Sequence, residues 1–218
     1  MLSTSRLGLL LSVVTTLLLL SACTLFDLWG QPSAPIRVQP TPRPAVPVPD
    51  HVLGEANASI TVEEYVDFQC PVCGSFARGT LQEIREKYVK SGQVKLKLHH
   101  FAFIGDESTR AAEASECAND QGKFWEYADL LFANQAGENQ GAFADAKLIS
   151  FAQQLDLQTE PFKSCLDNHQ HLAEVQSSTE VGAARGINSV PTLFINGQIV
   201  RGAISLEQFE QHLTSISK

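Results

Sequence analysis

"FQCPVCGSFA", residues 68–77, places Cys70 and Cys73 three positions apart, behind an apolar run and ahead of a helix-like one. The run before the cysteines, "SITVEEYVDF", is rich in β-branched and aromatic side chains, as buried strands are. Pro71 suits the first turn of a helix, where the N–H that proline lacks has no helical partner anyway. The stretch therefore predicts Cys70 at a helix N-terminus and Cys73 inside that helix.

The segments that follow extend this unit. Helical spacing continues to Gly92, and "QVKLKLHHFAF", residues 93–103, alternates apolar and polar side chains as a second strand does. Strand, helix and strand in this order predict parallel strands joined by a right-handed crossover. Residues 107–186 contain helical stripes and no strand-like run, so we expect a helical block there.

The C-terminal part returns to strands. "SVPTLFINGQIVRG" has two short apolar runs around Asn196-Gly197, which predicts a two-residue β-hairpin. "SLEQFEQHLTSI" then predicts an amphipathic helix with Ser205 as its N-cap.

Composition limits the classes of protein. A chain of 218 residues with 44 % hydrophobic and 18 % charged residues can bury a core without help from disulfides. Its net charge of −8 argues against nucleic acid as a partner, because phosphate binding depends on a basic surface.

The N-terminus predicts export and a lipid anchor. Arg6 precedes "LGLLLSVVTTLLLL", which has the length of a signal-peptide core and is short for a bilayer span. The next residues, Leu20-Ser21-Ala22-Cys23, resemble the lipobox of bacterial lipoproteins. We therefore expect residues 1–22 to be removed and Cys23 to carry lipid, which would place the protein outside the cytoplasm on the bacterial cell membrane. Ordinary cleavage or an uncleaved anchor are the alternatives.

Residues 23–50 read as a spacer. Seven of the ten prolines lie between Pro32 and Pro49, where no apolar periodicity survives and the chain should be extended. We expect the folded domain to cover residues 51–218.

A Cys-x-x-Cys pair is also half of many zinc sites, but a structural zinc needs two more close ligands. Cys117 and Cys165 stand alone, and the side chains of His99-His100 should point to opposite faces of a strand. The other histidines are scattered and are expected at the surface or as helix caps: His51, His169, His171 and His212. We therefore predict no metal site and no cofactor.

A redox role for the cysteine pair is the alternative hypothesis, and it depends on the position of Cys70 at a helix N-terminus. Unpaired N–H groups and the helix dipole stabilise a thiolate at a helix N-terminus, and such cysteines have pKa values of about 3.5 to 7.5 against about 8.5 for a free thiol. Cys70 is then the attacking thiolate, charged and reachable at neutral pH, and Cys73 resolves the mixed disulfide.

Three motifs together resemble the DsbA-like thiol-disulfide oxidoreductases of the thioredoxin superfamily: "EEYVDFQCPVCGSFA", "AAEASECANDQGKFWEYADLLF" and "GINSVPTLFINGQIVRGA". The resemblance covers about residues 51–218, in the order and spacing of that family. It implies an α/β thioredoxin-like fold with an inserted helical domain at about residues 107–186.

The resemblance also implies roles for three residues. Pro191 matches the family's cis-proline beside the cysteine pair, and Val190 would offer its backbone to a substrate strand. Glu64 matches the acidic residue buried under the disulfide, where a raised pKa would let it relay the proton of Cys73. From the residues alone, Pro191 could equally be a trans proline opening an edge strand, and Glu64 an exposed strand residue. The dipeptide Pro71-Val72 lacks the histidine of the best-known members, which leaves the oxidising strength of the pair open.

The five cysteines can all be assigned a role, with no unpaired cysteine left over. If Cys23 carries lipid and Cys70 pairs with Cys73, then Cys117 and Cys165 are left together in a compartment that permits disulfides. We expect a structural disulfide between them, with two buried free thiols as the alternative.

These observations predict a monomeric, membrane-tethered enzyme that transfers the Cys70-Cys73 disulfide to unfolded or reduced secreted proteins. A membrane redox partner would reoxidise it, as the resemblance implies. A reductase or isomerase is the alternative within the enzyme class. A lipid-anchored binding protein that uses the cysteine pair as a structural bridge is the alternative outside it.

Overall fold

A computed structural model describes residues 51–216 of the chain. The expected signal peptide, the lipobox at Cys23 and the proline-rich spacer lie outside the described residues. Between residues 51 and 216, no helix is long and apolar enough to cross a membrane.

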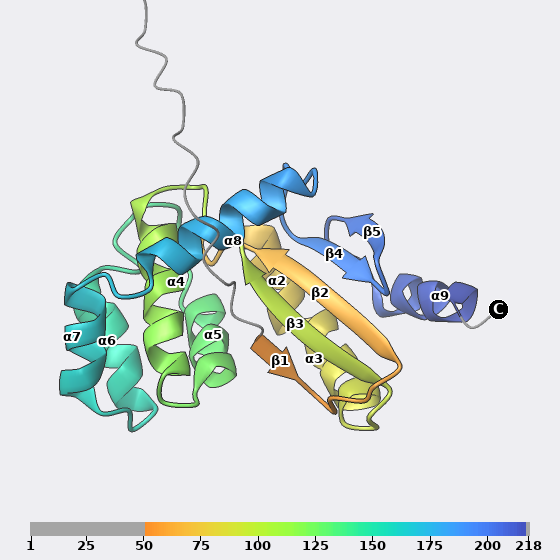
Figure 1. Ribbon diagram of the computed structural model, residues 1–218, viewed down its shortest axis with the longest axis horizontal. Helices are drawn as coiled ribbons and strands as arrows, with labels where there is room; N and C mark the ends of the chain where they lie inside the picture. The colour runs from red at the N-terminus through yellow and green to blue at the C-terminus, as the bar shows by residue number, and fades with distance from the viewer. Residues whose placement is uncertain (1–50, 217–218) are drawn as a thin grey trace, which may run out of the picture. The chain divides into compact units, whose positions relative to one another are not determined.

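The centre of the fold is a five-stranded sheet in the order β1-β3-β2-β4-β5 (Figure 1). The strands are β1 (His51–Leu53), β2 (Ile60–Val66), β3 (Val94–His100), β4 (Thr192–Ile195) and β5 (Gln198–Arg201). Only β2 and β3 run parallel, and the other neighbouring strands are antiparallel. The pairing confirms the prediction that these two strands run parallel. The three-residue strand β1 was not predicted, because so short a segment carries no periodicity.

The crossover helix is divided into three segments. α2 (Pro71–Arg78) is followed by α3 (Thr80–Ile84) and by the π-helical turn η2 (Arg85–Val89). Gly79 separates the first two with non-helical φ and ψ of −111° and −106°. The single helix expected from the spacing is therefore interrupted, because glycine allows the chain to change direction at this point.

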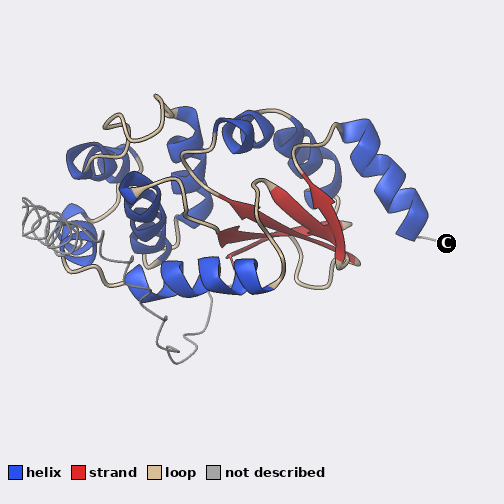
Figure 2. Cartoon of the chain, turned by 90° about the horizontal axis from the view of Figure 1, so that it is seen from above, coloured by secondary structure: helices blue, strands red, loops and turns tan. Residues whose placement is uncertain are grey.

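Only helices lie between β3 and β4 in the described chain. They are α4 (Asp106–Asn119), α5 (Phe124–Ala133), α6 (Asp145–Gln154), α7 (Thr159–Asp167) and α8 (Leu172–Ala184). Helices α4 to α7 gather beside the sheet, and α8 returns from them across the sheet toward β4 (Figure 1). In the view from above, helices lie on both sides of the sheet (Figure 2). Phe124 and Tyr127 of α5 are buried in the core.

The C-terminal elements follow the prediction. Asn196 and Gly197 join β4 to β5 with φ values of 46° and 83°, the left-handed pair that a two-residue hairpin turn requires. α9 (Leu206–Ile216) begins after Ser205, whose Oγ accepts a hydrogen bond from the N–H of Gln208 at 3.2 Å. The Gln208 side chain accepts one from the N–H of Ser205 in return, which completes a capping box.

Candidate active site

The cysteine pair lies at the N-terminus of α2, the helix that follows strand β2 in the chain. Cys70 is the N-cap residue, and its Sγ accepts a hydrogen bond from the N–H of Cys73 at 3.4 Å. On its other side, Cys70 Sγ lies 3.7 Å from the carbonyl oxygen of Val190. The helix start and a loop from 120 residues further along the chain thus meet at one sulfur atom.

The two thiols have very different environments. A hydrogen bond from the Cys73 thiol lowers the pKa of Cys70 to about 7, outweighing burial, and the N–H groups of Cys73 and Val72 add to the effect. Burial raises the pKa of Cys73 far above its ordinary value, and the neighbouring Cys70 raises it further. Cys70 is therefore the sulfur that ionises near neutral pH, while Cys73 keeps its proton.

Cys70 is less open than the sequence suggested. It is 7 % exposed and Cys73 is fully buried, so a small part of the Cys70 residue meets solvent. The reason is the loop before β4, which places the Val190 carbonyl against the sulfur. A substrate must approach over this loop rather than onto a bare helix end.

The loop before β4 contains a cis peptide bond between Val190 and Pro191. The Thr192 hydroxyl donates to the carbonyl of Ser189 at 2.7 Å, which closes the turn around the proline. The structure thus brings Val190 and Pro191 beside Cys70, and the trans arrangement that the residues alone allowed does not occur.

Glu64 lies on β2 and is 3 % exposed. Its neighbours on the same face, Val62 and Val66, are buried too, whereas the adjacent Glu63 is partly exposed on the opposite face. Burial raises the pKa of Glu64 to about 7, partly offset by the positive charge of Arg85. Its Oε1 atom has no hydrogen-bond partner among the described residues, and its charge raises the pKa of Cys73. A carboxyl group that titrates near neutral pH therefore acts electrostatically on the resolving cysteine.

The polar residues that hold the cysteine loop were not predicted from the sequence. Asp67 accepts hydrogen bonds from the Ser108 hydroxyl at 2.6 Å and from the N–H groups of Phe103 and Ile104. The side-chain amide of Gln135 donates to the carbonyls of Phe68 and Cys70, at 2.7 and 2.9 Å. These contacts join the loop to α4 and to the segment after α5. A polar residue ending a buried strand was the one available signal, since the partners are remote in sequence.

Cys117 and Cys165 form a disulfide with an S–S distance of 1.98 Å. It joins α4 to α7 and is separate from the Cys70 loop. The described residues thus contain one bridge and two free cysteines, Cys70 and Cys73.

The expectation for His51 was wrong. His51 is buried on β1, where its Nε2 lies 2.9 Å from Glu116 and its Nδ1 lies 3.1 Å from the carbonyl of Leu98. His100 reaches the same carboxylate at 2.7 Å. Burial opposes ionisation of Glu116, but the hydrogen bonds from His100 and His51 outweigh it and lower the pKa to about 2. The histidine became an internal partner because β1, unseen in the sequence, pairs with β3.

The comparisons with known proteins agree with this geometry. Residues 47–215 match the family model described as Thioredoxin. The chain is 26 % identical over 185 residues to disulfide bond formation protein D of Bacillus subtilis, covering 84 % of this chain and 78 % of that protein. It is also 32 % identical over 176 residues to a Na⁺/H⁺ antiporter NhaA 1 of Salinispora arenicola. That match covers 79 % of this chain but only 25 % of the antiporter, so the chain spans about a quarter of that relative.

Solved structures show the same architecture. Oxidised BdbD from Bacillus subtilis superposes with a TM-score of 0.71 at 25 % identity, covering 76 % of this chain and 91 % of that one. Wolbachia pipientis α-DsbA1 superposes with a TM-score of 0.69 at 23 % identity, covering 78 % and 92 %. The predicted fold class, a mixed α/β thioredoxin-like fold with added helices, is confirmed. The family match over most of its length and the DsbA-type fold show that this chain belongs to the thioredoxin family.

Proposed function

We propose that this protein is a thiol-disulfide oxidoreductase that transfers its Cys70-Cys73 disulfide to thiols of reduced, exported proteins. The observation that carries the proposal is the asymmetry of the pair, with Cys70 at the α2 N-terminus hydrogen-bonded by Cys73, and Cys73 fully buried. The similarity to disulfide bond formation protein D supports the same activity.

The exchange follows from this arrangement. A substrate thiolate attacks Cys70 Sγ of the disulfide, the Cys70-Cys73 bond breaks, and Cys73 leaves with the electron pair. A second substrate thiolate attacks the substrate sulfur of the mixed disulfide and releases Cys70 as the thiolate. The substrate loses two electrons and gains a disulfide, and the enzyme becomes a dithiol.

Glu64 is suited to move the proton of Cys73. The departing Cys73 thiolate is unfavourable in its buried position and needs a proton, while the reverse reaction must remove one. Glu64 is buried, has a pKa of about 7 and interacts electrostatically with Cys73, so it can give or take a proton near neutral pH. We assign Glu64 this role in the reaction.

The loop of Val190 and cis-Pro191 supplies the binding surface for the substrate chain. An extended peptide that pairs with the backbone at Val190 would place its cysteine against Cys70, because the Val190 carbonyl lies beside that sulfur. Binding through backbone groups would accept many sequences.

We further propose oxidation as the working direction. The pKa of Cys70, about 7, shows that its thiolate is stabilised. A stabilised thiolate favours the dithiol form of the enzyme, which makes its disulfide the stronger oxidant. A membrane redox partner would take two electrons from the dithiol and restore the disulfide. The lipobox at Cys23 and the spacer that follows support an extracytoplasmic location on the membrane.

The first test is thiol oxidation of a reduced, unfolded protein. Cys70→Ser and Cys73→Ser should each reduce the rate to that of the uncatalysed reaction, because neither variant can form the disulfide that is transferred to the substrate. The matched control, Cys23→Ser, should keep the full rate in solution. An unchanged rate in Cys70→Ser contradicts the proposal.

Equilibration of the chain with a glutathione buffer decides the direction. An oxidant should have a potential well above about −300 mV, the level below which structural bridges resist reduction. A value below that level would favour the binding protein with a structural bridge. A low potential combined with rapid exchange would favour a reductase.

A further inference from the structure

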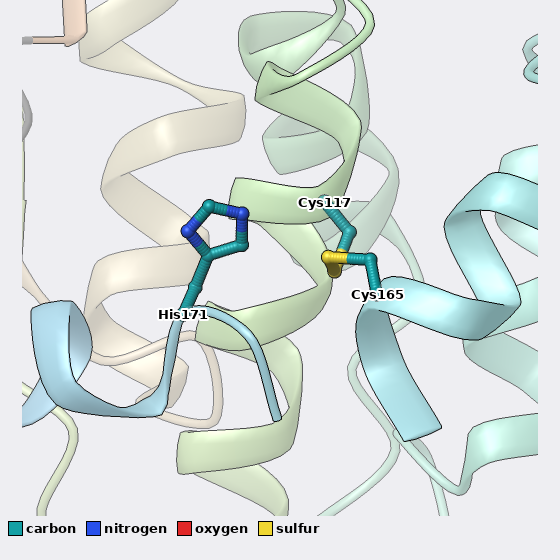
Figure 3. Close-up of side chains that lie close together, drawn as sticks. All are labelled: Cys117, Cys165 and His171. Carbon is teal, nitrogen blue, oxygen red and sulfur yellow. A yellow bond between two sulfur atoms is a disulfide. The ribbon is translucent and has the colours of Figure 1, made fainter. Parts of the chain in front are cut away.

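We propose that Cys117, Cys165, His171 and Asp120 form a zinc site when the Cys117-Cys165 disulfide is reduced. Figure 3 shows the His171 ring beside the disulfide, with the two cysteines on different helices. The candidate ligand atoms of Cys117, Cys165 and His171 lie within 4.8 Å of one another. This site lies outside the proposed active site and adds a metal-binding function to the protein.

Zinc was not expected from the sequence, because Cys117 and Cys165 have no second ligand close to them along the chain. The fold changes this, because α4, α7 and the start of α8 converge. Asp120 follows α4 one turn after Cys117, and its Oδ2 lies 3.9 Å from Cys165 Sγ and 2.8 Å from His171 Nε2. Two sulfurs, one imidazole nitrogen and one carboxylate oxygen are a donor set that zinc accepts in tetrahedral geometry.

The distances permit a metal once the bridge opens. Zinc binds sulfur at about 2.3 Å and histidine nitrogen at about 2.0 Å, so a tetrahedron places its two sulfurs roughly 3.8 Å apart. The Cα atoms of Cys117 and Cys165 are 5.9 Å apart, and rotation of the side chains can supply this separation. The helices therefore need no large movement.

A hydrogen bond already orients the histidine for this role. His171 Nδ1 lies 2.7 Å from Glu174 Oε2, and since a carboxylate only accepts, Nδ1 carries a proton. By the same reasoning Nε2 carries a proton that it donates to Asp120 Oδ2 at 2.8 Å, so a metal bound at Nε2 would replace this proton while Nδ1–H stays on Glu174. Metal-binding histidines typically donate their other N–H to a carboxylate in this way.

The site can also be reached. A cavity of about 460 Å³ is lined by Cys117, Asp120 and Cys165, together with Gln158, Ser164 and other residues of α7 and its flanking loops. The cysteines themselves are 1 % and 4 % exposed, so a bound metal would be sheltered while the Asp120 side remains open.

The chemistry requires a reductant, which we take to be a dithiol. A dithiol gives two electrons to the Cys117-Cys165 bond, becomes a disulfide itself and leaves two thiols on the protein. Zn²⁺ then replaces the two thiol protons and the Nε2 proton of His171, binds both sulfurs and that nitrogen, and the three protons pass to the solvent. In the oxidised protein the sulfur atoms of Cys117 and Cys165 are bonded to each other, so zinc binding and the disulfide exclude each other.

The experiment isolates these two thiols in the full-length chain. The background variant is Cys23→Ser/Cys70→Ser/Cys73→Ser. It is reduced with a phosphine, and the phosphine is then removed under oxygen-free conditions. The reduced chain is titrated with Zn²⁺ in competition with a chromogenic chelator. We expect one zinc per reduced chain and none per oxidised chain. Cobalt in place of zinc should give the sulfur-to-cobalt charge-transfer bands and the visible bands of a tetrahedral thiolate site.

Variants of the ligands and of a control histidine test the assignment. Added to the background, His171→Asn should weaken zinc binding at least about tenfold, and Glu174→Gln about 10 to 100-fold through the orientation of His171. His212→Asn, on α9, should bind as the background does. The proposal is overturned if the reduced chain binds no zinc, if the oxidised chain binds it equally, or if His171→Asn leaves the affinity and the cobalt spectrum unchanged.

Discussion

At the scale of single residues, Glu63 and Glu64 show how one step along a strand reverses the behaviour of a carboxyl group. Glu64 faces the core, and burial raises its pKa to about 7. Glu63 faces the other side, where the His99 imidazole, with its Nε2 3.5 Å from the carboxylate, outweighs burial and, helped by Arg185, lowers the pKa of Glu63 to about 2. The alternation of side chains in β2 therefore produces one carboxyl that titrates near neutral pH and one that is always charged.

The pKa of Glu64 predicts a loss of stability as pH rises from about 4.5 to about 7. Its folded pKa of about 7 lies above the ordinary 4.5, so the stability it contributes is complete below that ordinary value and is lost as pH rises through 7. Glu64→Gln should lack this loss and gain up to about 3 kcal/mol over the wild type at about pH 8, with little difference at about pH 4. Urea unfolding of the oxidised proteins measures both.

The neighbouring variant Glu63→Gln is the matched control. Its folded pKa is depressed, so its stabilising effect exists above the ordinary pKa and is lost as pH falls through about 2. Glu63→Gln should therefore lower the stability at neutral pH and leave in place the loss that Glu64 causes between about pH 4.5 and 7. Equal pH profiles for Glu64→Gln and wild type would show that Glu64 is not buried as described.

Cys70 yields a kinetic prediction. Because its pKa is about 7, alkylation of the reduced protein should depend on pH with a midpoint near 7, below that of an ordinary thiol. Mass-spectrometric mapping of iodoacetamide labelling at a series of pH values gives the midpoint, with Cys73 expected to stay unlabelled. A midpoint at about 8.5 or above, as for a free thiol, would contradict the assignment of Cys70 as the thiolate.

At the scale of elements, α8 shows how closely a helix and the sheet can approach. Tyr65, Phe101, Ile187 and Phe194 form a small buried cluster on the sheet face that carries Glu63. Gly182 of α8 lies directly against two of these rings, and a Cβ at that position would be 2.8 Å from Phe101 and 3.0 Å from Tyr65. The absence of a side chain at Gly182 lets the helix backbone rest on the aromatic surface.

Gly182→Ala tests this contact because two effects have opposite signs. Helix propensity alone predicts a gain of about 1 kcal/mol for alanine. The close approach to Phe101 and Tyr65 predicts a loss of about 1 to 3 kcal/mol, since the rings are packed and cannot yield freely. We expect a net loss, measured by thermal or urea unfolding, and a net gain would show that the interface has room.

At the scale of the whole molecule, two long-range links tie the helices together and to the sheet. The His51-Glu116-His100 cluster joins β1 and β3 to α4 through hydrogen bonds of 2.9 and 2.7 Å. The disulfide joins α4 to α7 across a sequence separation of 48 residues. Both links meet at α4, which also carries Ser108, the partner of Asp67 in the cysteine loop.

Removal of the disulfide should lower stability without changing the active-site thiols. Cys117→Ala/Cys165→Ala should reduce the free energy of unfolding by up to about 4 kcal/mol, because the unfolded chain gains the freedom of the opened loop. The measurement needs a metal chelator, so that no metal affects the comparison. The alkylation midpoint of Cys70 serves as the internal control and should stay near 7.

Features that depend on neighbours along the chain could be predicted from the amino-acid sequence. Cys70 at the start of α2, the Asn196-Gly197 turn and the capping box at Ser205 all follow from side chains within a few residues of one another. Apart from β1, the order of strands and helices followed in the same way, because periodicity is local. The signal peptide, the lipid on Cys23 and the spacer also rest on sequence alone and remain predictions.

The contacts that a side chain makes with distant parts of the chain came from the packing of the fold. The Val190 carbonyl reaches Cys70 across 120 residues, and His51 reaches Glu116 across 65. No local pattern encodes such contacts, because they depend on how the sheet pairs and how the helices pack around it. The pKa of Glu64, the cover over Cys70 and the meeting of Cys117, Cys165 and His171 are all consequences of that packing, which sets desolvation and distance together.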